Sequence, residues 1–321
     1  MQHILGQLGS RNINMMASKL TASEMALIDT LPKPPMAAEL QTTNIWIIEW
    51  LSTGERRTGE ELHEWIEQQR PGWSIYSRCV TKGEVIRSIE QAEHAAQQNS
   101  MVPVLHIEAH GCPIGIAPSR DAQDELLKWE EIATPLQQLN VATNCNLIVV
   151  VAACLGFAAI QALTKGPRAP SVALIGTDAT VNESDLLLGT KEFYRRIKDE
   201  KPRLIDIVES ASGEMRGTDF EIEPFVMLAY EASIEQLLRE SRPAERQARL
   251  ERFRQRMYQE TSFSAEEIER RLSELQGIPL SACFQQIWDH MFMIDLDSKN
   301  EERFGLDWAE IEHQILTMSS G

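Results

Sequence analysis

Apolar residues in the first part of the chain fall into two alternating patterns. Short runs rich in β-branched and aromatic residues start at Asn44, Trp73 and Met101, and each predicts a strand. Between them, residues 58–67 and 82–98 carry apolar side chains at the spacing of one helix face. The order strand, helix, strand, helix, strand predicts a parallel sheet with right-handed crossovers. We therefore expect an α/β fold.

The same alternation continues through the middle of the chain and then stops. The further elements that the pattern predicts are a helix at 124–139, a strand at 146–153, a helix at 157–163, a strand at 171–178, helices at 182–196 and 204–215, and a strand at 221–228. Pro224 indicates that this last strand lies at a sheet edge. From Ala232 onward the pattern is almost only helical. We predict an N-terminal extension at 1–40, an α/β domain at 41–231 and a helical region at 232–321.

The composition favours a protein of a reducing compartment. The chain has 321 residues, of which 43% are hydrophobic, and this is enough for a sizeable core. A net charge of −17 argues against a nucleic-acid-binding surface over the whole molecule. The five cysteines lack the spacing of a disulfide framework. The N-terminus does not have the pattern of a signal peptide, and every apolar stretch is shorter than the ~20 residues of a spanning helix. We therefore expect a cytoplasmic protein that does not bind nucleic acid or enter a membrane.

Two of the predicted strands end at a reactive side chain beside a glycine. One ends at His110 and Gly111, and the other ends at Cys154, followed by Gly156. The C-terminal ends of parallel strands share one edge of a sheet, so we expect the imidazole and the thiol to meet there. A thiol attacks a carbonyl as the thiolate, and a nearby histidine can protonate the departing amine. The helix predicted after Cys154 would add free backbone amides and a positive dipole end.

Other interpretations of these residues stay open. A buried cysteine or histidine taken alone is usually an inert core residue, and a catalytically silent scaffold that only binds a partner would keep the same fold. In an ideal strand His106, Glu108, His110 and Cys112 would all lie on one face, as in a zinc site of a metal-dependent enzyme. The glycine motifs of dinucleotide- and phosphate-binding loops are absent. Our main interpretation needs neither a metal nor a cofactor.

The two strand ends resemble those of the caspase-like cysteine peptidases. In that family a His-Gly pair follows one apolar strand, and an Ala-Cys-x-Gly motif follows the next, as at residues 153–156 here. The resemblance covers roughly residues 44–228, including the order of strands. It looks closest to the bacterial CHAT-type peptidases, because the stretch from Leu174 to Val181, and then Phe193 with Tyr194, is similar to their segment after the cysteine.

This resemblance implies a three-layer α/β/α sandwich with a central, mostly parallel sheet of about six strands. It also implies a dyad of His110 and Cys154, with an oxyanion hole formed by the backbone amides of Gly111 and Cys154. The expected activity is that of a cysteine endopeptidase (a thiol protease, thus a hydrolase) acting on a protein substrate. Ala152 stands where caspases carry the glutamine that helps to hold an aspartate side chain, and this departure argues against aspartate specificity.

Two carboxylates are candidates for a substrate pocket. Asp178 follows the strand after the cysteine, and Glu108 lies two residues before His110. A buried carboxylate recognises arginine or lysine by charge-assisted hydrogen bonds, so such a pocket would favour a basic side chain. A capping or surface role is the plain alternative for both.

The helical region carries an arginine-rich run from Arg239 to Arg256. Interleaved acids such as Glu245 and Glu251 make a solvated, salt-bridged helix face the simplest interpretation. The run could also hold the tail against the acidic remainder of the chain as a weak latch, since exposed pairs contribute only ~0–1 kcal/mol each. We therefore predict that a regulatory partner protein contacts this tail.

Overall fold

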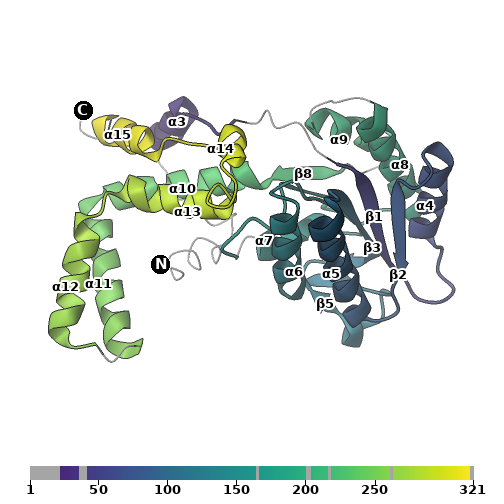
Figure 1. The fold of residues 1–321 in the computed structure, drawn as a ribbon, viewed down its shortest axis with the longest axis horizontal. Helices are drawn as coiled ribbons and strands as arrows, with labels where there is room; N and C mark the ends of the chain where they lie inside the picture. The colour runs from purple at the N-terminus through teal and green to yellow at the C-terminus, as the bar shows by residue number, and fades with distance from the viewer. Residues whose placement is uncertain are drawn as a thin grey trace. The chain divides into compact units, whose positions relative to one another are not determined.

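The protein divides into two compact units. A computed structural model describes residues 22–35, 42–163, 166–199, 204–215, 218–260 and 263–318 (Figure 1). The first unit extends to Val226, and the second contains the chain from Met227 together with helix α3 (Ala22–Thr30). Helix α10 (Phe225–Ser241) spans both this division and the expected domain boundary at 231/232. Of the expected extension at 1–40, residues 1–21 and 36–40 lie outside the described residues.

The first unit is an α/β structure built on a mostly parallel sheet. Its main strand order is β2-β1-β3-β6-β7-β8, and only β8 runs antiparallel to its neighbour. The strands are β1 (Asn44–Trp50), β2 (Ser74–Arg78), β3 (Pro103–Cys112), β6 (Ile148–Ala152), β7 (Ala173–Gly176) and β8 (Glu221–Pro224). Two short antiparallel strands, β4 (Gly115–Ala117) and β5 (Leu127–Lys128), extend β3. The expected α/β fold with a mostly parallel sheet is confirmed.

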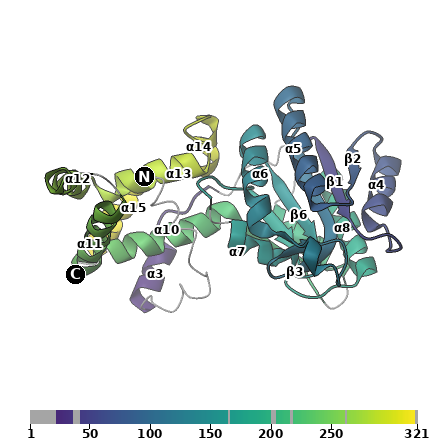
Figure 2. The same cartoon turned by 90° about the horizontal axis from the view of Figure 1, so that it is seen from below.

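Helices flank this sheet (Figures 1 and 2). The first unit contains α4 (Thr58–Gln69), α5 (Lys82–Asn99), α6 (Trp129–Ala142), α7 (Ile160–Leu163), α8 (Glu183–Asp199) and α9 (Leu204–Ser212). On one face of the sheet, Ile47 and Val104 share a core with Leu62 of α4, Leu187 of α8 and Ile207 of α9. On the other face, the indole N–H of Trp46 donates to Ser88 Oγ of α5 at 3.0 Å, and α6 lies beside α5 (Figure 2).

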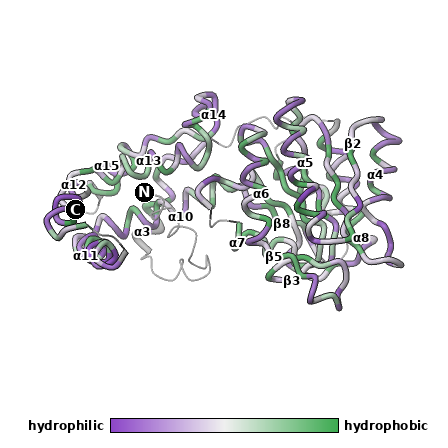
Figure 3. The backbone as a smooth tube through the Cα atoms, turned by 60° about the horizontal axis from the view of Figure 1, so that its bottom comes forward, coloured by the Kyte–Doolittle hydropathy of each residue, from purple (hydrophilic) through white to green (hydrophobic). Residues whose placement is uncertain are grey.

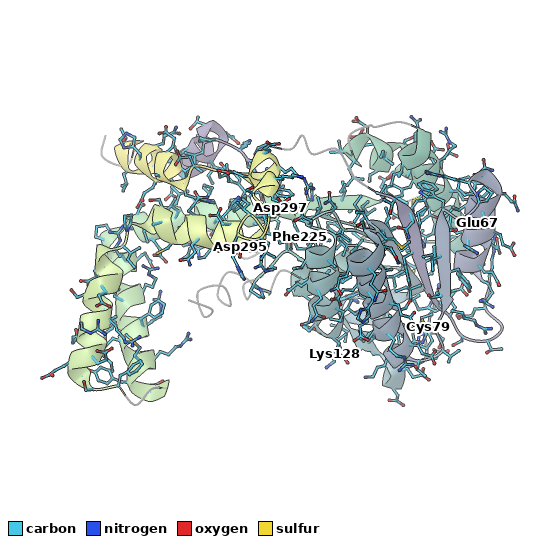
Figure 4. All side chains as sticks on the ribbon, viewed as in Figure 1. Glu67, Cys79, Lys128, Phe225, Asp295 and Asp297 are labelled. Atoms are coloured by element: carbon cyan, nitrogen blue, oxygen red, sulfur yellow. The ribbon has the colours of Figure 1, made fainter. Side chains whose placement is uncertain are left out.

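Helices α6 and α10 begin elsewhere than their sequence pattern predicts. The helix expected from residue 124 starts at Trp129, because β5 pairs with β4 and the Lys128 N–H donates to the Glu131 carboxylate at the helix start. The strand expected at 221–228 ends at Pro224, and α10 starts at Phe225 (labelled in Figure 4). Proline has no N–H to continue a ladder. The expected edge position of this strand is confirmed, since β8 is the last strand of the order and pairs with β7.

The hydropathy of the chain follows this arrangement. The strands of the first unit are largely hydrophobic, while the outward turns of the surrounding helices are hydrophilic (Figure 3). All residues of β1 and β6 are buried. Among the helices that the structure describes, none combines the length and the apolar character needed to cross a membrane.

The second unit is helical throughout its described part. After α10 it contains α11 (Pro243–Glu260), α12 (Ala265–Gly277), α13 (Leu280–Met291), α14 (Lys299–Phe304) and α15 (Trp308–Met318). An aromatic cluster of Trp288, Phe292, Phe304 and Trp308 joins α13, α14 and α15. Helices α11 and α12 form a hairpin (Figure 1) whose own small core consists of Leu250, Ile268 and Leu272, with Phe253 and Met257 against it.

Candidate active site

Parallel pairing puts His110 and Cys154 beside each other at one edge of the sheet. Strands β3 and β6 pair in register as far as Glu108 and Ala152. His110 and Cys154 each follow this last pair by two residues. His110 is still part of β3, so its side chain belongs to the sheet face that carries Glu108, whereas Cys154 lies in the turn after β6. Cys154 packs against the core cluster of that face. His110 and Cys154 thus lie two residues beyond the last pair of two neighbouring strands.

Gly111 shows how closely the two strand ends approach. A Cβ atom built on Gly111 would lie 2.1 Å from the carbonyl oxygen of Cys154 and 2.9 Å from Cβ of Ala153. Both distances are far below van der Waals contact, so a side chain here would push the two segments apart. The glycine after the histidine therefore allows the end of β3 to lie directly against the turn that carries the cysteine.

The Cys154 thiol is half-buried and contacts the loop before α8. The Val181 N–H donates to Sγ at 3.4 Å, and Sγ lies 3.6 Å from the Val181 carbonyl oxygen. Within the described residues no hydrogen bond joins Sγ to the His110 imidazole. The fold thus brings the two predicted residues together at the level of the backbone, while the thiol itself is held by Val181.

The backbone after Cys154 differs from the expected helix start. Leu155 takes a left-handed φ of 54° and leads into a 3₁₀ turn (Gly156–Ala159) before α7. The N–H groups of Leu155, Gly156 and Phe157 donate to the carbonyls of Ala179, Ala153 and Thr177 at 3.0 Å each. The expectation of free amides after the cysteine is therefore wrong for these three residues. The amide of Cys154 itself has no hydrogen-bond partner in the described part of the chain.

A carboxylate that the sequence patterns did not single out holds the His110 imidazole. Oε1 of Glu55, in the loop after β1, lies 2.8 Å from His110 Nε2. Both side chains are partly exposed: 34% for Glu55 and 25% for His110. The sheet order places β1 next to β3, so the loop that follows β1 reaches the edge where His110 lies. The sequence feature that could have pointed to Glu55 is the polar loop at residues 52–57, which follows a predicted strand.

His106 and Glu108 form a buried network beneath the site. His106 Nδ1 lies 3.0 Å from the Tyr194 hydroxyl, and Nε2 lies 3.2 Å from Glu108 Oε1. The other Glu108 oxygen accepts from the Thr58 hydroxyl at 2.9 Å. A carboxylate accepts at Nε2, so the Nδ1 of a neutral His106 accepts from the Tyr194 hydroxyl. Burial and the nearby Glu108 raise the pKa of Tyr194 well above its usual value. Both nitrogens of His106 and both oxygens of Glu108 therefore have partners inside the protein.

This network changes the interpretation of the two pocket candidates. Glu108 is only 3% exposed and both of its oxygens are hydrogen-bonded inside the protein. It therefore acts as a core carboxylate and does not offer an open pocket. Asp178 is exposed in the loop between β7 and α8, the loop that also carries Val181.

The zinc interpretation finds little support in the geometry. No group of three or more histidine, cysteine, aspartate or glutamate side chains is arranged to hold a metal ion in the part of the chain that the structure describes. Instead, His106 pairs with Glu108, His110 pairs with Glu55, and the Cys112 thiol contacts the Gly115 carbonyl oxygen at 3.3 Å.

Three of the other four cysteines lie in settings that disfavour reaction, and Cys112 is partly exposed. Cys79 (labelled in Figure 4) is 2% exposed, and burial raises the pKa of its thiol to about 12. Cys145 is fully buried. Cys283 lies in the second unit, and burial raises the pKa of its thiol as well.

The sequence was also compared with known proteins. No protein-family model matches the chain, and no curated protein matches it.

Proposed function

We propose that the protein is a cysteine endopeptidase of the caspase-like, CHAT type, with a three-layer α/β/α sandwich as its catalytic unit. The observation that carries this proposal is the register of β3 and β6, whose last pair, Glu108 with Ala152, lies two residues before His110 and Cys154. The close approach of Gly111 to the Cys154 carbonyl supports the same alignment. The proposed substrate is a protein, and the reaction uses only groups of the polypeptide.

The imidazole supplies the acid–base chemistry of this reaction. Glu55 lies against Nε2, which leaves Nδ1 of His110 to accept the Sγ proton of Cys154 after the thiol turns away from Val181. The thiolate attacks the carbonyl carbon of the scissile peptide, and Nδ1–H then protonates the departing amine. A water molecule, deprotonated by the same nitrogen, hydrolyses the thioester and restores the thiol.

Two backbone amides are candidates for the oxyanion hole. The Cys154 amide has no partner among the described residues. Gly111 lies opposite Ile116 in the β3–β4 ladder, between the pairs His110–Ala117 and Cys112–Gly115. Opposed residues in an antiparallel ladder alternate between bonded and non-bonded pairs, and the pair that closes a two-residue hairpin is bonded. The Gly111 N–H then points away from β4, and donors of this kind stabilise the developing negative charge.

Substrate preference rests on Asp178 in this proposal. Its exposed carboxylate lies in the same short loop as Val181, which contacts the thiol. A carboxylate near the site favours arginine or lysine in the substrate. Glu108 does not contribute, because it is buried and fully hydrogen-bonded.

A second candidate function is a catalytically silent scaffold. The observation in its favour is the thiol, which is hydrogen-bonded to Val181 and not to His110. A protein of this kind would bind its partner through the same surface without cleaving it. An electrophilic probe separates the two candidates, since only a reactive thiolate is modified.

The experiment combines peptide cleavage with thiol labelling. The wild-type protein is expected to cleave members of a peptide library that carry arginine or lysine at the cleavage site, whereas Cys154→Ala and His110→Ala lose more than about 100-fold in rate with unchanged circular dichroism. Cys112→Ala and Cys283→Ala serve as controls and are expected to keep wild-type turnover. Either site variant retaining near wild-type turnover would contradict the proposal.

Labelling of the native protein gives an independent readout. An iodoacetamide or acyloxymethylketone probe at pH 8 is expected to modify Cys154 and to leave Cys79 intact. The raised pKa of Cys79 leaves only ~1 part in 10⁴ of this thiol ionised at pH 8. An unreactive Cys154, together with no cleavage of any peptide, would favour the scaffold.

A further inference from the structure

We propose that the loop between β1 and α4, residues 51–57, is a positioning element of the site, in which Glu55 fixes the tautomer of His110 and Arg56 ties the loop to the segment that holds Cys154. The catalytic consequence of this inference rests on the proposed function. The state of the imidazole and the restraint on the thiol can both be measured without a substrate.

Glu55 is held at both oxygens of its carboxylate. Oε1 lies 2.8 Å from His110 Nε2, and Oε2 accepts at 3.3 Å from the Ser52 N–H, which also donates to the Pro118 carbonyl at 2.9 Å. The Glu55 N–H donates in turn to the Ser52 carbonyl at 3.3 Å and closes a tight turn. Gly54 in this turn has a φ of 97°, a conformation that glycine adopts without strain. The turn therefore fixes the direction in which the carboxylate meets the imidazole.

The tautomer follows from the chemistry of this contact. A carboxylate only accepts hydrogen bonds, so Nε2 carries the hydrogen when the imidazole is neutral. Nδ1 of His110, which has no hydrogen-bond partner in the described part of the chain, then holds the free lone pair. Without the carboxylate a neutral imidazole exchanges between its two tautomers, and Nδ1 carries the hydrogen for part of the time.

Arg56 joins this loop to the first turn of α8. Its Nη1 donates to Ser184 Oγ at 2.6 Å and lies 3.9 Å from a Glu183 oxygen. The same guanidinium makes two 2.8 Å hydrogen bonds with Glu61 of α4. Ser184 follows shortly after Val181, whose N–H and carbonyl contact the Cys154 thiol. Arg56 therefore links the loop on the histidine side to the loop on the cysteine side.

The next residue anchors the loop to the sheet. Arg57 pairs with Glu49, which is 1% exposed in β1, and donates to the Tyr76 hydroxyl of β2. Three consecutive side chains of the loop are thus attached to three different parts of the first unit: Glu55 to the end of β3, Arg56 to the start of α8, and Arg57 to β1 and β2. This attachment explains why a loop remote from Cys154 in the sequence can set the geometry of both reacting groups.

Nitrogen-15 NMR of the His110 imidazole in the full-length protein tests the role of Glu55. The wild type is expected to show a single tautomer with hydrogen on Nε2, and Glu55→Gln a mixture of both tautomers. The matched control is Glu64→Gln, which removes an exposed carboxylate of α4 and is expected to match the wild type. Identical imidazole signals in Glu55→Gln and the wild type would overturn the assignment of Glu55.

Kinetics add a second readout for the same residue. Glu55→Gln is expected to lower kcat by about 10- to 100-fold with KM within about twofold, because a misaligned base slows the chemical step and not binding. Glu55→Asp is expected to recover part of the loss. If the wild type cleaves no peptide, the proposed function fails, and the NMR result still decides the role of Glu55.

Alkylation of Cys154 tests Arg56. Arg56→Ala removes the link to Ser184 and frees the loop that holds the thiol, so iodoacetamide is expected to modify Cys154 at least about threefold faster. The control is Arg87→Ala, an exposed arginine of α5, which is expected to leave the rate unchanged. An equal alkylation rate in Arg56→Ala and the control would overturn the assignment of Arg56.

Discussion

At the scale of single residues, the site depends on the absence of a side chain as much as on the reactive groups. Gly111 lies against the backbone of Cys154, and a Cβ there would be 2.1 Å from the Cys154 carbonyl oxygen. We expect Gly111→Ala to lower the free energy of unfolding by about 1–3 kcal/mol, because a rigid backbone atom must move to make room. The same displacement separates the ends of β3 and β6, so peptide cleavage is expected to fall as well.

Urea denaturation at neutral pH measures this effect. Gly277→Ala is the matched control, since nothing lies within 4 Å of a Cβ built there, and its free energy of unfolding is expected to stay within about 0.5 kcal/mol of the wild type. Equal stability of the Gly111 and Gly277 variants would show that the two strand ends separate without cost.

At the scale of secondary-structure elements, α8 matters because it follows the loop that holds the thiol. Glu192 joins α8 to α9 by accepting from the Ser210 hydroxyl at 3.1 Å, and it also accepts from Arg195 and Arg196. These hydrogen bonds, of which that from Arg195 is the strongest cause, lower the pKa of Glu192 from 4.5 to about 2.

The sign of the resulting pH dependence follows from this lowered pKa. The carboxylate stabilises the folded state above its unfolded pKa of 4.5, and this stabilisation is lost as the pH falls through the folded value of about 2. We expect Glu192→Gln to lower the free energy of unfolding at pH 7 by about 1–2 kcal/mol, a value reduced for the exposure of the two arginines. The loss of stability between about pH 5 and pH 2 should become shallower.

Urea denaturation at pH 7, 5 and 3 provides the measurement. Glu209→Gln removes an exposed carboxylate of α9 and is expected to keep the slope of the wild type. A Glu192 variant whose stability follows the wild-type curve down to pH 3 would mean that the link between α8 and α9 does not depend on this charge.

At the scale of the whole molecule, the arginine-rich run has its partners close by. Arg249 pairs with Glu240 at 2.8 Å, Arg254 pairs with Glu269 across the α11–α12 hairpin at 2.8 Å, and Arg242 pairs with Glu24. All of these contacts lie within the second unit. They weaken the hypothesis of an electrostatic latch on the α/β unit and leave partner binding as the proposed role of the tail.

Deletion of the hairpin, residues 243–277, tests that role. A cut at the expected boundary would divide α10, whereas the hairpin has its own core. We expect the shortened protein to cleave a short peptide within about twofold of the full-length rate at low and high ionic strength, because the ion pairs of Arg249, Arg254 and Arg270 in the hairpin lie within the second unit. Cleavage of a protein substrate that is recruited through the hairpin is expected to fall. An unchanged rate on that substrate would argue against a recruiting role of the hairpin.

The sequence alone determined which segments form strands and helices, and where the candidate nucleophile and base lie along them. Periodic burial leaves a local signature, so β1, β3, β6 and most helices follow their patterns. His110 lies within β3, which continues to Cys112, and Cys154 lies two residues after the end of β6. The start of α6 departs from its pattern because β5 pairs with β4, a strand that lies earlier in the chain. This pairing keeps the chain extended up to Lys128, so the helix begins only at Trp129.

The tertiary structure decided which of these residues meet and how each polar group is used. The order of the sheet places β1 beside β3, and only this neighbour relation brings Glu55 to His110. Packing of α4 and α8 over β3 buries Glu108 between Thr58 and His106, which removes it from the pocket that its spacing suggested. Contacts between segments far apart in sequence depend on strand order and register. A local pattern of apolar and polar residues encodes which face of an element is buried, but not what it is buried against.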